Sequence, residues 1–196
     1  MQSRAEKNRH YLQVAQLNRG LAKSRQEVSL SAYSFLFAEM VHYALAEAKR
    51  GYNMEDRLHE MGIRIGYKIL DLLCFRERNN RRETRLLSML TFISQTCWKY
   101  LFGHAGDLLK GQQSENEYMI NDKSLPLNKF ISAPRDYGSM SCGAYAAGIV
   151  EGVLCSAEFP AEVSAHTIED TSSQKSTTIL IKFLPEVLAR EREMQS

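Results

Sequence analysis

The chain has 196 residues, of which 44% are hydrophobic and 24% charged, and its formal net charge is +2. This composition excludes an intrinsically disordered or fibrous chain, and no apolar segment reaches the roughly 20 residues that cross a bilayer. The nearly neutral charge argues against wholesale binding of nucleic acid. The length predicts one globular domain, residues 28–196, which follows a basic N-terminal segment.

The basic segment, residues 1–27, is predicted to be a mobile arm. Six lysine or arginine side chains stand there against two glutamates, and apolar residues are sparse. The first ten residues are polar and lack the apolar core of a signal peptide. We therefore expect a cytoplasmic protein.

Three long helices are predicted in the first half of the domain. Apolar residues recur at helical spacing over residues 29–48. Asn53 is a typical capping residue for a second helix, 54–76. A third helix is predicted at 83–102, and Gly103 stands at the position where helices commonly end.

After residue 103 the pattern changes to short strands and turns with one further long helix. The predicted elements are a strand at 117–121, an extended piece at 130–132, a helix at 141–155, strands at 162–168 and 177–184, and a terminal helix at 186–194. Helices followed by strands that one helix interrupts are typical of an α+β fold. We expect a layer of long N-terminal helices packed with a small antiparallel sheet.

The N-terminal helices carry more apolar surface than a small sheet can cover. Helix 54–76, for example, is apolar on two nearly opposite sides, and such a helix must be covered on both. A partner subunit packed on the helices would account for the surplus, and a helical layer buried within the monomer is the alternative. The candidate interface residues are Leu36, Phe37, Met40, Val41, Ile63, Tyr67 and Leu70.

Helix 141–155 is predicted to have one side made of small residues. Gly148 and Gly152 each cost roughly 1 kcal/mol in helix propensity relative to alanine. Small side chains allow another backbone to approach closely, and we expect that neighbour to be the sheet. Glu151 interrupts the apolar run of this helix.

No catalytic residue, cofactor site or metal site is predicted. The sequence contains no dinucleotide-binding glycine motif, phosphate-binding loop or zinc-protease motif, and its four cysteines form no C-x-x-C pair. Cys142 stands near the start of a helix, where the helix dipole would lower the thiol pKa. A Cys142-dependent enzyme would need His104 or His166 within hydrogen-bond reach of the sulfur.

The segment 76–85 contains five arginines and two glutamates between two predicted helices. Arg78, Arg81 and Arg82 form a candidate basic contact patch for phosphates, lipid headgroups or an acidic protein surface. The segment lacks the interleaved aromatic residues of a single-strand nucleic-acid site. A solvated helix junction is the alternative interpretation.

Six strings of residues, taken in their order and spacing, resemble the small subunits of the TRAPP (transport protein particle) vesicle-tethering complex. The strings are EVSLSAYSFLFAEMV (27–41), NRRETRLLSMLTFI (80–93), WKYLFG (98–103), FISAPRDYGSMSCGAYAAGIVEGVL (130–154), FPAEVSAH (159–166) and TTILIKF (177–183). The resemblance covers roughly residues 27–193.

The resemblance implies a non-catalytic subunit that pairs with a related TRAPP subunit through its helical layer. Several such pairs form a core that acts as guanine nucleotide exchange factor for a Rab GTPase, and the complex is peripheral at endoplasmic reticulum and Golgi membranes. A paralogous subunit carries an S-acylated cysteine near the start of the third helix. Residues 80–87 contain no cysteine here, so acylation is not expected.

The alternative function is a small-molecule- or acyl-binding domain of the same fold. That function requires an enclosed apolar cavity between the helices and the sheet.

Overall fold

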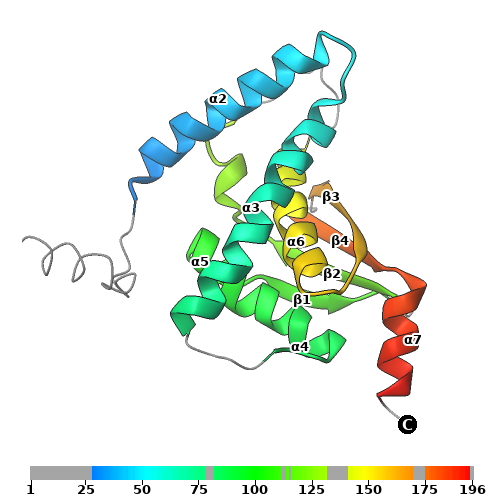
Figure 1. Ribbon diagram of the computed structural model, residues 1–196. Coiled ribbons are helices and arrows are strands. Elements are labelled where there is room, and N and C mark those ends of the chain that lie inside the picture. The colour runs from blue at the N-terminus through cyan, green and yellow to red at the C-terminus, as the bar shows by residue number, and fades with distance from the viewer. Residues whose placement is uncertain are drawn as a thin grey trace, which may run out of the picture.

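The computed structural model describes residues 28–77, 82–111, 114, 116–131, 141–169 and 175–194. Helix α3 (Met54–Glu77) lies on helix α6 (Gly143–Ser156), and α6 in turn lies on a four-stranded sheet (Figure 1). Helix α2 (Leu30–Ala48) meets α3 at one end of this stack, and its N-terminal end projects away from it (Figure 1). The predicted arm, 1–27, lies outside the described residues.

The first two helices confirm the predicted boundaries closely. The turn between them contains Gly51 at a φ of 98°, which a residue with a Cβ adopts only with strain. Asn53 Oδ1 accepts a hydrogen bond from the amide of Glu55 over 2.8 Å and caps the start of α3. The buried apolar side of α2 consists of Phe37, Val41 and Ala44.

The third predicted helix begins later than expected and is not α-helical throughout. It consists of α4 (Leu86–Thr91), the π-helical segment η1 (Phe92–Cys97) and α5 (Trp98–Phe102). Gly103 ends it in the left-handed conformation, as predicted, with a φ of 86°. The carbonyl of Ser94, within the π-helical segment, accepts a hydrogen bond from the amide of Gly106 over 2.9 Å. This bond joins the helix to the chain that enters the sheet.

The sheet is antiparallel and has the strand order β1-β2-β4-β3. Its strands are β1 (Asp107–Lys110), β2 (Glu117–Asp122), β3 (Ala161–Glu169) and β4 (Lys175–Phe183). The alternation in β4 places Ile179, Ile181 and Phe183 on one buried face, as the sequence predicts. That face receives α6.

Between the third helix and α6 the sequence analysis missed one strand and placed one extended piece wrongly. Strand β1 was not expected, because its four residues alternate too briefly to give a pattern. The extended piece at 130–132 is not a strand, since a 3₁₀ turn, η2 (Pro126–Asn128), leads into a further turn at Phe130. Ser132, the last residue of that piece, lies outside the described residues.

The small side of α6 faces a helix and not the sheet, which corrects the expectation for its central glycines. A Cβ built on Gly66 of α3 would lie 2.8 Å from the Cα of Gly152, and one on Gly148 would lie 3.0 Å from the Cα of His59. The glycine at the start of α6, Gly143, does meet the sheet. A Cβ built on Gly143 would lie 2.7 Å from Thr177 Cγ2 on β4. The two helices therefore cross with their backbones in contact.

Helix α6 is apolar because it is covered on both sides, by α3 and by strands β3 and β4. Within the residues that the structure describes, no helix combines the length and the apolar character needed to span a membrane.

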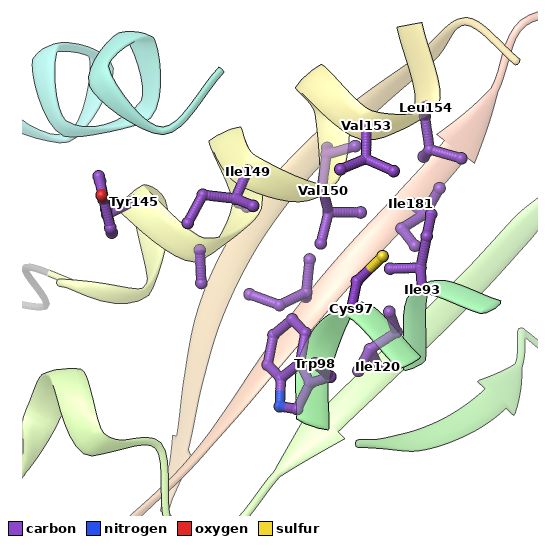
Figure 2. Close-up of a cluster of buried hydrophobic side chains, with 14 of the residues drawn as sticks. Ile93, Cys97, Trp98, Ile120, Tyr145, Ile149, Val150, Val153, Leu154 and Ile181 are labelled. Carbon is purple, nitrogen blue, oxygen red and sulfur yellow. The ribbon is translucent and has the colours of Figure 1, made fainter. Parts of the chain in front are cut away.

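The core lies between α6, the π-helical segment and the sheet (Figure 2). Trp98 is its largest fully buried side chain, and the indole Nε1 donates a hydrogen bond to the buried carboxylate of Asp122 over 2.8 Å. Asp122 also faces His104 Nε2 at 2.9 Å. The polar atoms of this part of the core are thus paired, as burial requires.

The terminal helix α7 (Pro185–Glu193) is attached to the start of α4. Glu191 accepts a hydrogen bond from Arg85 Nε over 2.8 Å and another from the amide of Leu86 over 3.1 Å. The second bond satisfies one of the free amides at the start of α4. A side chain near the C-terminal end of the chain therefore caps a helix that begins at residue 86.

Candidate functional site

Helix α2 has an outer apolar face that the described chain does not cover. We define this face by Phe35, Leu36 and Tyr43, which point away from the buried side of the helix. The exposed fraction is 76% for Phe35 and 61% for Leu36. Exposed apolar residues gathered on one helix face are typical of an interface with another protein.

The four candidate interface residues on α2 fall into two groups. Leu36 lies on the outer face, and Met40 is half-buried. Phe37 and Val41 are buried within the chain, and the ring of Phe37 lies 5.5 Å from the ring of Tyr145 on α6. Phe37 and Val41 thus hold α2 against its own subunit, while Leu36 is available to a partner.

The three candidates on α3 are also unequally exposed. Tyr67 is 46% exposed, whereas Ile63 and Leu70 are half-buried. Phe75, which was not among the candidates, is 58% exposed near the end of the same helix. Contact between these residues and a partner stays a prediction.

The candidate basic patch can be described only at Arg82, because Arg78 and Arg81 lie outside the described residues. Arg82 Nη2 lies 2.6 Å from Glu158 Oε2. Its hydrogen bond and positive charge lower the pKa of Glu158. Arg82 therefore has an acidic partner within its own chain, at the end of α6.

The geometry does not support the hypothesis of a Cys142-dependent enzyme. Burial raises the pKa of Cys142 to about 11, so the expected lowering by the helix dipole was wrong. His104 pairs with Asp122, and His166 Nε2 lies 3.0 Å from Ser164 Oγ.

Among the described residues, no group of three His, Cys, Asp or Glu side chains could hold a metal ion.

A groove of about 620 Å³ lies between the start of α3, α6 and β3. It is open to solvent, and its charged lining residues are Glu55, Asp56, Glu60, Glu151 and Glu162. The alternative function, binding of a small molecule or an acyl chain, requires an enclosed apolar cavity, and this groove is open and lined by charged residues.

Glu151 joins the three elements around the groove. Its Oε2 lies 3.0 Å from His59 Nε2 on α3 and accepts a hydrogen bond from the amide of Val163 on β3 over 3.3 Å. The glutamate that interrupts the apolar run of α6 thus has a structural role at the rim of the sheet.

The comparisons with known proteins agree with this fold. The profile of a family described as "Transport protein particle (TRAPP) component" matches residues 33–184. The chain is 47% identical over 176 residues to "Trafficking protein particle complex subunit 5" of Dictyostelium discoideum, covering 89% of this chain and 95% of that protein. The chain belongs to the TRAPP component family. Helices α3 to α6 and all four strands lie within the matched residues.

Other members of the TRAPP family show the same relationship. The human protein named subunit 5 is 38% identical over 183 residues, covering 92% of this chain and 94% of that protein. "Trafficking protein particle complex subunit 31" of Saccharomyces cerevisiae is 28% identical over 249 residues, covering 95% and 87%. These relatives confirm the family that the sequence strings resembled.

Among solved structures, a TRAPP subunit 3 from Naegleria fowleri, covalently bound to palmitic acid, is similar in fold. The TM-score is 0.64 at 16% identity, and the match covers 79% of this chain and 96% of that one. The similarity confirms the predicted α+β fold of the TRAPP small subunits.

Proposed function

We propose that the chain is a non-catalytic core subunit of the TRAPP vesicle-tethering complex. In this function it pairs with a related TRAPP small subunit and contributes to assembling the guanine nucleotide exchange factor for a Rab GTPase in transport from the endoplasmic reticulum to the Golgi. It acts in the cytoplasm and reaches both membranes through its complex. The observation that carries this proposal is the outer apolar face of α2, in a chain that belongs to the TRAPP family.

Burial of the outer face of α2 against a partner protein would be energetically favourable. Covering a large apolar side chain is worth about 1.5–3 kcal/mol, so Phe35 and Leu36 together would contribute several kcal/mol to association. The same helix is fixed to its own subunit by Phe37 and Val41 on the opposite side. It can therefore present a preorganised surface, which lowers the conformational cost of binding.

Two of the described thiols, those of Cys142 and Cys97, are not poised as nucleophiles. Burial raises the pKa of Cys142 to about 11 and that of Cys97 to about 12, so both thiols are protonated at neutral pH. Exchange on the GTPase would then arise from a surface assembled from several subunits, to which this chain contributes structure.

Co-expression with related TRAPP small subunits tests the proposal. We expect a stable heterodimer by light scattering, and we expect the purified larger complex to accelerate nucleotide release from a Rab GTPase. Omission of this chain should prevent that complex from assembling. A chain that remains a stable monomer at micromolar concentrations in the presence of those subunits would contradict the proposal.

A further inference from the structure

Strand β3 forms one edge of the sheet, because the strand order is β1-β2-β4-β3. The amide of Leu184 donates to the carbonyl of Pro160 over 3.1 Å, so the even-numbered residues of β3 are the ones that bond to β4. The odd-numbered residues, such as Ala165 and Thr167, therefore direct their backbone N–H and C=O groups toward the free edge.

The described part of the chain covers only the first half of this edge. The carboxylate of Glu151 accepts the outward amide of Val163 over 3.3 Å. Farther along, the amides of Ala165 and Thr167 have no hydrogen-bond acceptor among the described residues. Thr167 is exposed and Ala165 is half-buried, so solvent reaches this part of the edge. An open edge of this kind is a template for another strand.

The open half of the edge borders the groove between α3, α6 and β3, and the groove is acidic. Asp56 and Glu60 line it from α3, Glu162 lines it from β3, and its described lining residues include no lysine or arginine. All three of these carboxylates are exposed, although Glu60 is paired with Arg57 at 2.6 Å. A strand that enters the groove would gain from positive charge and lose from negative charge.

We propose that the open edge of β3 binds an extended, lysine- and arginine-rich segment of a partner protein as an added strand. The outward backbone groups at Ala165 and Thr167 supply the main-chain hydrogen bonds, and the acidic groove selects basic side chains. At about 3.4 Å per residue, the open edge from Ala165 to Glu169 pairs with roughly five residues of such a segment.

Fluorescence anisotropy with short labelled peptides tests the proposal on the full chain, alone or in its co-purified assembly. The probe is a nine-residue peptide of alternating lysine and valine. A second peptide has glutamate in place of lysine, and a third keeps the lysines but carries an N-methyl group on every backbone amide, which blocks both of its edges. We expect the first peptide to bind at least tenfold more tightly than the other two, and its binding to weaken as salt is raised.

Two variants locate the site. Ala165→Pro removes an outward amide without removing a bond to β4, and edge strands tolerate proline in such positions. We expect it to weaken binding of the lysine peptide at least tenfold. Asp56→Asn combined with Glu162→Gln should weaken binding about fivefold and reduce its salt dependence. Glu39→Gln combined with Asp107→Asn, which removes the same charge elsewhere, should have no effect.

Three outcomes would overturn the proposal. The first is the absence of binding by the lysine peptide. The second is equal binding of the N-methylated peptide, which would show a purely electrostatic surface; this comparison uses the unaltered chain and does not depend on the folding of any variant. The third is binding that increases at least tenfold when residues 1–27 are removed, which would show that the chain's own basic segment occupies the edge.

Discussion

The imidazole Nε2 of His59 lies 3.0 Å from the carboxylate Oε2 of Glu151, and this contact joins α3 to α6 beside their glycine-lined crossing. Both side chains are mostly buried, and the same carboxylate oxygen receives the amide of Val163. A polar group in such a position stabilises the fold only while its partners are present.

Replacement of Glu151 by leucine should therefore destabilise the chain. The change leaves the imidazole of His59 and the amide of Val163 without an acceptor, and we expect the free energy of unfolding to fall by about 1–3 kcal/mol. Glu151→Gln keeps an acceptor oxygen and should cost less. Urea denaturation measures both, with the exposed Glu162→Gln as the control. Equal stability of Glu151→Leu and the unaltered chain would contradict the assigned role.

The crossing of α3 and α6 should not tolerate a single added methyl group. Gly148→Ala improves helix propensity by roughly 1 kcal/mol. Its Cβ, however, would overlap the backbone of His59, and overpacking costs typically 1–3 kcal/mol or more. We expect a net loss of stability in thermal unfolding. Ser156→Ala, at the exposed end of the same helix, serves as the control and should change stability little.

A charge on the outer face of α2 should break the proposed heterodimer and leave the subunit folded. Leu36→Glu places a carboxylate at a 61% exposed position, so the monomer accommodates it, whereas burial in an interface would not. Analytical ultracentrifugation of the co-expressed pair measures dissociation, and circular dichroism reports folding. Leu87→Glu, at a 59% exposed leucine on α4, is the matched control. Dissociation by both variants equally would argue against a specific role of α2.

The cysteines should differ sharply in reactivity. Cys74 is exposed, whereas burial raises the pKa of Cys142 to about 11 and that of Cys97 to about 12. At pH 7.5 the thiolate, which is the reactive form, is therefore very scarce at both buried sites. We expect iodoacetamide to modify Cys74 first in the native protein, as mass spectrometry of peptides would show. Rapid modification of Cys142 under native conditions would contradict its burial.

The same burial predicts a loss of stability in alkali. The pKa of Cys142 is raised from its ordinary value of 9.0 to about 11 in the folded chain, so the unfolded state loses the thiol proton first as pH rises. Stability from this group is complete below pH 9 and falls between about pH 9 and pH 11. Cys142→Ala should flatten this fall in urea denaturation across that range. An unchanged slope would show that the thiol does not contribute.

Much of the architecture could be predicted because its signals are local. Asn53 and Gly103 marked helix ends by capping chemistry, and the alternation in β4 marked a half-buried strand. Such signals depend only on neighbouring residues. The predicted helices and three of the four strands accordingly appear near their expected positions.

The partner of the small side of α6 could not be predicted in the same way. Gly148 and Gly152 predict that some backbone approaches, but not which one. The matching signal was present on α3, where Gly62 and Gly66 repeat the same spacing and meet the same helix. Their agreement becomes decisive only when the two helices are known to cross. The interface residues on α2 could not be predicted fully for a similar reason. Periodicity separates the faces of the helix but does not show which face points inward, and the structure places Phe37 and Val41 on the buried side.

The bond between Glu191 and the amide of Leu86 has a consequence for how the chain is made. A ribosome synthesises the start of α4 long before it reaches α7, so this helix lacks its acceptor while α6 and strands β2 to β4 are made. The bond can form only when α7 has left the exit tunnel. A truncated product that ends before α7 would therefore leave the amide of the buried Leu86 without this acceptor, and its α4 would begin less stably than in the finished subunit.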